Sequence, residues 1–385
     1  MSTAATGAEY AAGLCSAGMS ADPRPACLLT GIVSPYRREA FRLLNEAQNV
    51  ELIAHEHAGS PIPGLTVHRT SEAGAVRLAA SGRYRAVIAG LDGRIALPGA
   101  YAAARARRIP FVLWATIWAH PRTPAHALSF LPTRHLYRAA DAVATYGPHV
   151  SRYVEGYRGT DSGVVVAPQA VDVDHFGAPV TDAERSAARE RAGGADAELL
   201  VLYVGRLVSE KGIETLIEAW RHADLGTGAR LALAGQGPLE QRLERLLPEA
   251  RLLGEVSSDA LPALYAAADV LVLPSIHTAS FREPWGLVVN ESMLQRTPVV
   301  ASDAVGAAAG RLVRDGRNGF VVPAGDPDAL AARLRALAAD SELRARLGAT
   351  GRKDAATYTP AAWAAGMGQA MAAAGVGRGG SGSDC

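Results

Sequence analysis

Residues 199–220 read LLVLYVGRLVSEKGIETLIEAW, and the pattern that decides the fold is visible in this one stretch. It opens with a continuous apolar run at 199–205, which is typical of a strand buried on both faces. From Lys211 onward the apolar residues recur with helical spacing, and glycines at 205 and 212 bound the loop between the two patterns. The stretch therefore predicts one β–loop–α unit of a parallel sheet.

The same alternation runs through the whole chain. Apolar runs typical of buried strands lie at 26–33, 51–55, 86–91, 111–116, 142–145, 164–168, 199–205, 230–235, 250–254, 269–275, 297–302 and 319–323. Twelve parallel strands are too many to pack around one hydrophobic core. The sequence therefore predicts an α/β fold of two doubly wound, Rossmann-like domains that divide near residue 170. Ligands of such sheets bind beyond the carboxyl ends of the strands, so we expect the site in the cleft between the domains.

Composition indicates a globular protein without a membrane span. The chain has 385 residues, 49% of them hydrophobic, and no apolar run approaches the ~20 residues that cross a bilayer. The first 25 residues lack the pattern of a secretion signal and are expected to be a tail, as is the glycine-rich end at 376–385. Cys15, Cys27 and Cys385 have neither disulfide nor metal-ligand spacing, which favours the cytoplasm.

Charge differs between the two halves of the chain. Residues 26–170 hold 16 arginines and 9 acidic residues, whereas residues 171–385 hold 22 basic and 27 acidic residues. This asymmetry indicates either different partners for the two halves or an ordinary solvated surface rich in arginine. We expect no nucleic-acid partner, and the oligomeric state stays open.

The loop at 205–212 has features of a diphosphate site. Only two lysines occur in the chain, Lys211 and Lys353, so a lysine beside a glycine in this loop suggests that a compact cation is needed there. Arg206 and Lys211 would converge on a diphosphate, the arginine as a planar fork and the lysine as a point charge. The alternative is two surface cations near a helix start, where the helix dipole disfavours them.

Other nucleotide and metal motifs are weak. Gly235-Gln236-Gly237 lacks the third glycine of a dinucleotide fingerprint, and no GxxxxGK[ST] loop occurs, so an NAD-dependent oxidoreductase is disfavoured. Asp172-Val173-Asp174 is either a divalent-cation string or a turn that leads into a linker. Asp326 has the position of a helix N-cap.

Residues 281–292, FREPWGLVVNES, place Glu283 and Glu291 on either side of an apolar run. From the spacing alone these glutamates are a catalytic pair, a sugar-binding pair or an accident of surface charge. The run Leu287–Val289 is expected to be the buried face of a helix near 287–295.

Five segments in order resemble one family. They are VVVAPQAVDVDHF (164–176), LYVGRLVSEKGIETLIEAW (202–220), LALAGQGPLEQRLERL (231–246), LLGEVSSDALPALYAAADVLVLPS (252–275) and the segment from EPWGLVVNES to PAGD (283–326). Together they resemble the family-4 retaining glycosyltransferases of the GT-B fold, a bacterial-type resemblance that is dense from about 164 to 350 and thin before it. It implies transfer of a sugar from a nucleoside diphosphate sugar to an acceptor hydroxyl, with attack on the face of departure and without a metal or other cofactor.

The resemblance also implies roles for individual residues. Expected catalytic residues are Glu283, Lys211, Arg206 and His120. Expected donor-binding residues are Gly205, Arg206, Lys211, Val256, Glu283, Trp285, Gly286, Leu287 and Glu291, with Glu283 facing the donor sugar and Glu291 the ribose hydroxyls. Expected acceptor-binding residues are Gly31, Tyr36 and Arg37.

The expected boundaries combine the strand count and the composition of the tails with the resemblance, which implies the returning helix. The first 25 residues are a tail, residues 26–170 an acceptor-binding domain and residues 171–355 a donor-binding domain. Residues 356–375 form a helix that returns to the first domain, and residues 376–385 form a second tail.

Several points depart from the family pattern or stay open. Gly31 stands alone where relatives often carry a glycine pair, and Thr116 or Trp118 is an alternative to His120 as the residue near the reacting sugar. The acceptor is expected to be a small molecule or natural product. The alternatives are a lipid- or polysaccharide-directed transferase and an acceptor-free epimerase or hydrolase.

The lipid alternative rests on a basic, partly apolar stretch around 122–138. It contains Leu128, Phe130 and Leu131 among arginines, which indicates weak peripheral contact with an anionic membrane. Prolines at 121, 124 and 132 are expected to interrupt this stretch, which favours the reading without a membrane.

Overall fold

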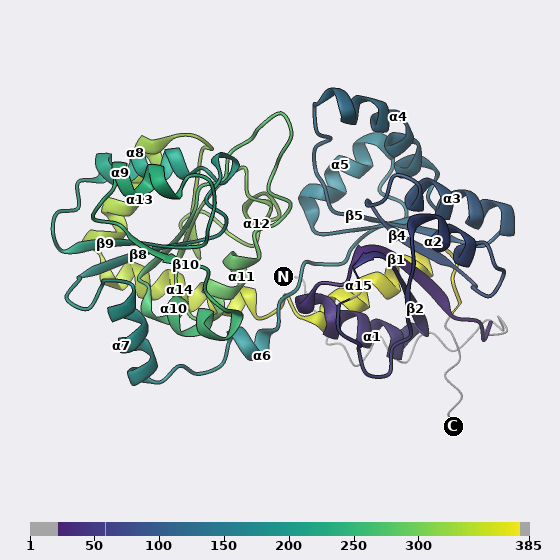
Figure 1. The fold of residues 1–385 in the computed structure, drawn as a ribbon, viewed down its shortest axis with the longest axis horizontal. Coiled ribbons are helices and arrows are strands. Elements are labelled where there is room, and N and C mark those ends of the chain that lie inside the picture. Colours follow the sequence, from purple (N-terminus) through teal and green to yellow (C-terminus); the bar gives the residue numbers. More distant parts are fainter. Residues whose placement is uncertain (1–21, 58, 378–385) are drawn as a thin grey trace, which may run out of the picture.

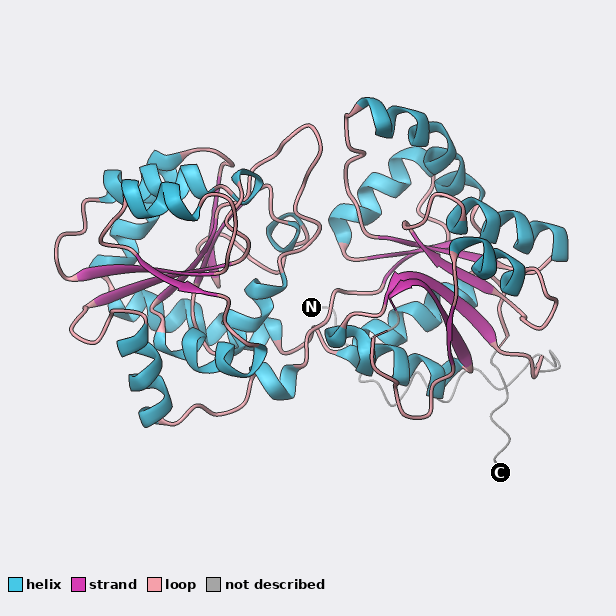
Figure 2. Cartoon of the chain, viewed as in Figure 1, coloured by secondary structure: helices cyan, strands magenta, loops and turns pink. Residues whose placement is uncertain are grey.

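The computed structural model describes residues 22–57 and 59–377, and the side chains of 124–127 lie outside that description. Two parallel sheets, one of seven and one of six strands, each lie between layers of helices (Figures 1 and 2). We call the part built on the seven-stranded sheet the first domain and the other the second domain. The boundaries expected from the sequence stay predictions, and the two tails fall mostly outside the described residues.

The sheet of the first domain has the strand order β3-β2-β1-β4-β5-β6-β7. Its strands are β1 (Ala26–Ile32), β2 (Val50–His57), β3 (Val67–Arg69), β4 (Val87–Gly90), β5 (Phe111–Ala115), β6 (Ala142–Thr145) and β7 (Val164–Val166). Its helices are η1 (Pro35–Arg37), α1 (Arg38–Gln48), α2 (Glu72–Ala79), α3 (Ala96–Arg107), α4 (Pro124–Ala139) and α5 (Pro148–Arg158). The chain reverses its winding direction between β1 and β4, where the carboxyl ends of two neighbouring strands diverge and leave room for a ligand.

The sheet of the second domain has the order β10-β9-β8-β11-β12-β13. Its strands are β8 (Leu199–Val204), β9 (Ala229–Ala234), β10 (Arg251–Gly254), β11 (Val270–Leu273), β12 (Val299–Ser302) and β13 (Gly319–Val322). Its helices are α6 (Val173–Phe176), α7 (Asp182–Arg191), η2 (Ser209–Lys211), α8 (Ile213–Ala223), α9 (Glu240–Leu246), η3 (Ser258–Ala260), α10 (Leu261–Ala267), α11 (Leu287–Leu294), α12 (Gly306–Ala309), α13 (Pro327–Ala339) and α14 (Ser341–Ala355). The switch point lies between β8 and β11.

Burial explains why the strands read as continuous apolar runs. Every residue of β5, β8 and β11 is buried, because helices cover both faces of each sheet. All twelve expected strands are present. The thirteenth strand, β3, was missed because two of its three residues, VHR, are polar and form no apolar run, whereas the equally short edge strand β7 consists of three valines.

The last helix, α15 (Pro360–Ala373), packs on the first domain although the chain reaches it from the second. It lies beside α1 and against β6 and β7. Trp363 of α15 is 1% exposed, and its ring centroid lies 5.5 Å from that of Phe41 and 5.3 Å from that of Trp114. This aromatic cluster ties the C-terminal helix to the sheet of the first domain.

One expectation about helix α4 was wrong. The helix runs unbroken from Pro124 to Ala139 with Pro132 inside it, whereas the prolines were expected to interrupt this stretch. Pro124 stands at the first position, where a proline costs no hydrogen bond, and Pro132 removes a single bond from a long helix. Among the described helices none is both long and apolar enough to cross a membrane.

Candidate active site

Lys211 and Glu283 form an ion pair at the carboxyl ends of β8 and β11. The side chains of Lys211 and Glu283 are only 15% and 9% exposed, so water screens this pair less than it screens a surface pair. The hydroxyl of Ser275, the second residue after β11, donates to the same carboxylate at 3.3 Å. The structure therefore brings together two of the expected catalytic residues, which lie 72 positions apart in the sequence.

Glycine allows the loops of this site to approach one another. Gly212 has φ +74°, and a β-carbon there would lie 1.9 Å from the carbonyl oxygen of Pro274. Gly235 has φ +142°, and a β-carbon there would lie 1.9 Å from the carbonyl oxygen of Gly205. Only glycine fits these two contacts, so the glycines bring the loops after β8, β9 and β11 together.

Arg206 lies in the same loop but is directed differently from Lys211. Its side chain is 64% exposed and pairs with Glu210 at 2.9 Å. An exposed guanidinium paired with a neighbour on the loop can turn toward an anionic ligand at little cost, because such surface pairs contribute little to stability. Arg206 therefore lies beside the Lys211–Glu283 pair without contacting it.

Helix α11 begins at the residue after Gly286, which has φ +91°. The first amides of a helix have no acceptors within it and carry partial positive charge, so the start at Leu287 presents donors beside Glu283. The expectation that Leu287–Val289 forms the buried face is only partly correct. Val289 is fully buried, but Leu287 and Val288 are half-buried, and the residues from Asn290 to Leu294 are buried instead.

Glu291 lies in the second turn of α11, on a buried face. It is 9% exposed and accepts a hydrogen bond from the hydroxyl of Tyr265 at 2.6 Å. Burial raises the pKa of Glu291 to about 7, although the Tyr265 hydroxyl and the nearby His175 oppose that rise. The two glutamates therefore have different environments: Glu283 faces a cation, and Glu291 faces a neutral phenol.

Two side chains of the first domain bond to the backbone of the Glu283–Trp285 turn. The indole nitrogen of Trp118 donates to the carbonyl of Glu283 at 3.1 Å, and Nε2 of His149 donates to the carbonyl of Pro284 at 3.2 Å. Burial lowers the pKa of His149 to about 4, so the ring is neutral at pH 7. The donor-side loop is thus held directly by the opposite domain.

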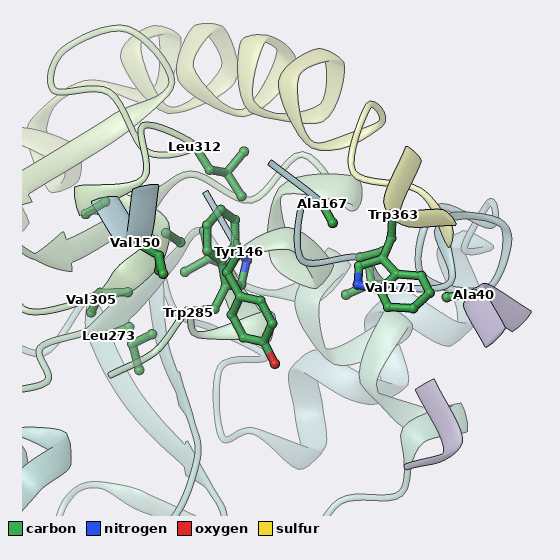
Figure 3. Close-up of a cluster of buried hydrophobic side chains, with 14 of the residues drawn as sticks. Ala40, Tyr146, Val150, Ala167, Val171, Leu273, Trp285, Val305, Leu312 and Trp363 are labelled. Carbon is green, nitrogen blue, oxygen red and sulfur yellow. The ribbon is translucent and has the colours of Figure 1, made fainter. Parts of the chain in front are cut away.

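Trp285 anchors this turn inside a buried cluster at the domain boundary (Figure 3). It is 2% exposed, and its indole nitrogen donates to the side-chain oxygen of Asn290 at 2.7 Å. Its ring centroid lies 5.8 Å from that of His149 and 5.5 Å from that of Tyr358. The side chain of Trp285 therefore has a packing role, and only its backbone is left to face a ligand.

His120 contacts helix α4 of its own domain. Its contacts include the ring of Phe130, 5.2 Å away between centroids, and the hydroxyl of Ser129 at 3.4 Å, both from α4. The histidine that touches the Glu283–Trp285 turn is His149, which the sequence did not single out. The role expected for His120 stays a prediction.

Val256 lies in the loop after β10, where it is half-buried. The preceding Gly254 accepts a hydrogen bond from the amide of Gly235 at 2.7 Å, which joins this loop to that after β9. Val256 thus lies at the same edge of the sheet as Gly205 and Lys211.

The three residues expected at the acceptor site are close together in the first domain. Gly31 and Arg37 line a cavity of about 240 Å³, and the hydroxyl of Tyr36 accepts a hydrogen bond from Nε of Arg37 at 3.1 Å. The lining of this cavity comprises Thr30, Gly31, Ile32, Arg37, Glu56, Gly90, Asp92, Trp114, Thr116 and Tyr146. The sequence did not identify Glu56 and Asp92, although both follow the apolar cores of strands whose ends were expected to carry chemistry.

The acid string at 172–174 has a structural role. The Asp172 carboxylate accepts from the amides of Asp174 and His175, at 3.2 and 2.9 Å, and caps helix α6. Asp326 caps α13 in the same way, as predicted, by accepting from the amide of Ala329 at 2.9 Å. Within the described residues, no group of three or more histidine, cysteine or acidic side chains is arranged to hold a metal ion.

Comparison with known proteins agrees with this arrangement. A family model described as Glycosyl transferases group 1 matches residues 184–354. The alpha-D-kanosaminyltransferase of Streptomyces kanamyceticus is 36% identical over 183 residues, which cover 45% of each protein. The D-inositol 3-phosphate glycosyltransferase of Geodermatophilus obscurus is 34% identical over 233 residues, which cover 56% of this chain and 49% of that protein. The chain spans about half the length of these curated relatives.

A solved structure extends the likeness to both domains. Alr3699/HepE of Anabaena, in complex with UDP and glucose, superposes with a TM-score of 0.73 at 19% sequence identity. The superposition covers 91% of this chain and 99% of that one, and it confirms the GT-B fold expected from the sequence. Residues 184–354 therefore form a domain of the glycosyl transferases group 1 family, within a chain that has the GT-B fold.

Proposed function

We propose that this protein is a retaining glycosyltransferase that moves a sugar from a nucleoside diphosphate sugar to an acceptor hydroxyl. The observation that carries the proposal is the buried Lys211–Glu283 pair beside the start of α11, in a domain of the group 1 family. Lys211 would stabilise the diphosphate as it leaves, and Glu283 would accept hydrogen bonds from hydroxyls of the donor sugar. Arg206 would turn from Glu210 to the diphosphate.

The proposed chemistry assigns the transition-state charge to residues of the chain. A leaving nucleoside diphosphate gains negative charge as the glycosidic bond breaks, and fixed cations and helix amides stabilise that charge most in the transition state. Attack on the face of departure, with the leaving phosphate taking the acceptor proton, needs no covalent nucleophile and no metal. Glu291 would hold the ribose, where it now accepts from Tyr265.

The donor is testable without knowledge of the acceptor. A thermal-shift panel of UDP-, GDP-, ADP- and TDP-sugars should single out one base, because a ligand at a hundredfold excess over Kd stabilises by about 2.7 kcal/mol. UDP-sugars come first in the panel, since the Anabaena neighbour was solved with UDP. If none of the four shifts the melting temperature, the donor proposal fails.

The stereochemistry, the metal independence and the location are tested separately. NMR of the product should show the same anomeric configuration as the donor sugar, and inversion would rule out the same-face mechanism. Turnover should persist in excess EDTA.

Release of the nucleoside diphosphate should require an acceptor, and turnover without one would favour an epimerase or hydrolase. A cytoplasmic location is proposed for this enzyme.

A lipid-directed transferase is the second candidate, and one surface feature favours it. On α4, Leu128 is 86% exposed and Leu131 is 67% exposed, on an unbroken helix that also carries Arg134 and Arg138. The test is sedimentation with anionic vesicles at low salt, comparing the wild type with Leu128→Ser/Leu131→Ser. Ile95→Ser, a change at an exposed apolar residue immediately before helix α3, is the control. Failure of the wild type to sediment would remove this candidate.

A further inference from the structure

The protein itself uses only part of the carboxylate of Glu291. One oxygen, Oε2, accepts a hydrogen bond from the hydroxyl of Tyr265 at 2.6 Å. The other oxygen, Oε1, has no donor among the described residues and is not fully buried. Glu291 follows Leu287 by four positions, so it lies on the same side of α11 as the residue that starts the helix beside Glu283. The carboxylate is therefore held at one oxygen and offers the other to a ligand.

The two oxygens of Glu283 are divided in the same way. Lys211 and Ser275 both contact Oε2 of this residue, and no described residue donates to its Oε1. At each glutamate of the 281–292 segment, a donor of the protein thus fixes one carboxylate oxygen and leaves the second one free. This arrangement suits a ligand with several hydroxyls, because an ionised carboxylate has about four acceptor positions.

Tyr265 is fixed as the donor of its contact with Glu291. It lies in α10 and is fully buried, and its carbonyl accepts a hydrogen bond from the hydroxyl of Thr297 at 2.6 Å. Burial raises the pKa of the Tyr265 hydroxyl well above its ordinary value, so the phenol stays protonated and donates to the carboxylate. A ligand cannot reach the buried phenol, whereas it can reach Oε1 of Glu291. Tyr265 therefore acts on a ligand only through Glu291.

His175 of α6, the other polar neighbour of Glu291, has a different partner. It lies close enough to affect the charge of Glu291, but its Nε2 donates to the carbonyl of Ser258 at 3.1 Å. Within the described part of the chain, Tyr265 is thus the sole hydrogen-bond donor to Glu291. Loss of this one hydroxyl would leave the carboxylate free to rotate and less stable in its ionised form.

We propose that Tyr265 is a positioning residue for the donor: it holds Oε2 of Glu291 so that Oε1 accepts from the ribose hydroxyls, and the site thereby selects ribonucleoside over deoxyribonucleoside diphosphates. This inference rests on the proposed transferase function and names the nucleotide class that its donor site takes. A nucleotide without one of the hydroxyls leaves the held carboxylate short of a hydrogen bond. That loss is large, because the acceptor is charged and the site is built to bind a hydroxyl.

Ribose analogues test the selection directly. UDP, 2′-deoxyUDP and 3′-deoxyUDP are titrated into the wild type by calorimetry, or the matching set for the base that the thermal-shift panel selects. At least one deoxy analogue should bind about tenfold more weakly than the ribonucleotide, since a hydrogen bond to a charged group contributes more than a neutral one. Equal binding by all three, or tighter binding by a deoxy analogue, would overturn the proposal.

Tyr265→Phe removes only the hydroxyl, and the ratio of the two Kd values separates positioning from folding. The advantage of UDP over the deoxy analogue should fall from about tenfold to about threefold or less, whereas a general loss of structure weakens both nucleotides alike. In the Glu291→Gln background, where both partners of the bond are changed, Tyr265→Phe should alter the ratio no further.

Tyr84→Phe is the matched control for this variant. Tyr84 is also fully buried, and its hydroxyl donates to the carboxylate of Glu51 at 2.9 Å, but in the first domain. Its replacement should cost stability in urea unfolding and leave the ratio of Kd values unchanged. A wild-type ratio in Tyr265→Phe, or an equal fall of the ratio in Tyr84→Phe, would refute the positioning role.

The outcomes separate this inference from the proposed function. If the wild type selects the ribonucleotide and Tyr265→Phe still does, the donor site stands and only the role of Tyr265 is wrong. If nucleotides bind without selection for ribose, the inference fails while acceptor-dependent release of nucleoside diphosphate still tests the transferase. If no nucleoside diphosphate of the panel binds, the transferase proposal fails and this inference fails with it.

Discussion

Glu283 takes part in two interactions at once, through different atoms. Its carboxylate pairs with Lys211 and accepts from Ser275, while its backbone carbonyl accepts from Trp118 of the first domain. A substitution at this residue removes the carboxylate but leaves the backbone carbonyl that Trp118 contacts. Lys211 carries the positive charge of the pair, so its replacement tests most directly how that charge stabilises the leaving group.

Replacing Lys211 by alanine should lower kcat by about 10²–10³-fold, the loss typical of removing one fixed group that stabilises transition-state charge. The measurement is release of nucleoside diphosphate in the presence of acceptor. Lys353→Ala is the matched control, because Lys353 is the only other lysine of the sequence and is exposed on α14. A Lys211→Ala enzyme with nearly wild-type kcat and an unchanged fold would contradict the assigned role.

Glu291 should make stability depend on pH. The side chain of an unfolded glutamate has a pKa near 4.5, and burial raises the pKa of Glu291 to about 7, so the unfolded state ionises first as the pH rises. The stabilising contribution of Glu291 is complete below pH 4.5 and is lost as the pH rises through 7, a change of about 3 kcal/mol. The free energy of unfolding of Glu291→Gln, relative to wild type, should therefore rise by about 3 kcal/mol between pH 4.5 and pH 8.

Urea unfolding at a series of pH values measures this difference. Comparison with the wild type cancels the contribution of His149, whose lowered pKa of about 4 costs stability as the pH falls below 6.5. Glu244→Gln, at an exposed residue of α9, is the control. A difference that stays constant with pH would show that Glu291 titrates normally.

Sequence reasoning identified residues that stand in motifs and missed those whose role depends on tertiary contact. Lys211, Glu283 and Glu291 lie in segments that resemble the family, and the structure gives each a specific partner. His149 contacts the carbonyl of Pro284, which lies 135 positions away, and no motif in the Gly147–His149 segment predicts this contact. Glu56 is similar, since only the fold places it and Asp92 beside Gly31.

At the scale of elements, α11 combines a ligand-facing start with a buried body. Gly286 lets the chain enter the helix beside Glu283, and the hydrogen bond between Trp285 and Asn290 closes the first turn on itself. Asn290 is fully buried, so water cannot replace its side-chain oxygen as the acceptor for the indole N–H of Trp285. The shape of the turn therefore depends on one buried side-chain hydrogen bond.

Replacing Asn290 by alanine should destabilise the protein by about 1–3 kcal/mol, because it leaves the indole N–H of Trp285 buried without an acceptor. Urea unfolding gives the cost, and a double-mutant cycle with Trp285→Phe isolates the hydrogen bond from the cavity that the alanine leaves. In the Trp285→Phe background the same change should cost less by about 1 kcal/mol. An equal cost in both backgrounds would show that the bond contributes nothing.

Helices and strands with a strong apolar pattern in the sequence were predictable. Those with a weak pattern, or with a residue that locally disfavours the element, were not. The buried strands such as β8 follow from their apolar runs, since burial on both faces leaves few polar residues. Strand β3 contains a histidine and an arginine in its three residues, so it forms no apolar run, and its pairing with β2 exists only in the assembled sheet. Helix α4 is an element where the local signal was misleading. Pro132 alone disfavours a helix, but in the folded protein the segment packs against α5 and is helical throughout.

At the scale of the whole molecule, the two domains meet through hydrogen bonds to backbone atoms of the donor-side loops. Besides Trp118 and His149, the amide of Arg122 donates to the carbonyl of Ala279 at 2.6 Å, and Arg152 donates to that of Ala309 at 3.2 Å. The two wound sheets were predictable from the repeated β–loop–α pattern. The relative orientation of the domains was not, because it depends on contacts such as these between segments far apart in the sequence.

The Trp118 and His149 contacts should hold the two domains together and contribute little to donor binding. A Trp118→Phe/His149→Phe variant keeps aromatic rings at both positions but cannot donate to the carbonyls of Glu283 and Pro284. The donor would bind the second domain alone, so the Kd for the nucleoside diphosphate should change less than twofold. The value of kcat should fall about tenfold or more, because loss of two hydrogen bonds at about 1 kcal/mol each lets the acceptor domain move away from the reacting sugar.

Small-angle scattering provides a readout independent of turnover. The radius of gyration of the double variant should exceed that of the wild type when both are saturated with nucleoside diphosphate. Arg152→Ala removes only the exposed contact to Ala309 and should change kcat less than the double variant does. Loss of kcat with an unchanged radius of gyration would place the effect inside the closed site, and a large loss of donor affinity would mean that Trp118 and His149 shape the donor loop itself. Both results would contradict a role in closure, since only a change in domain separation lowers kcat, raises the radius of gyration and spares the Kd together.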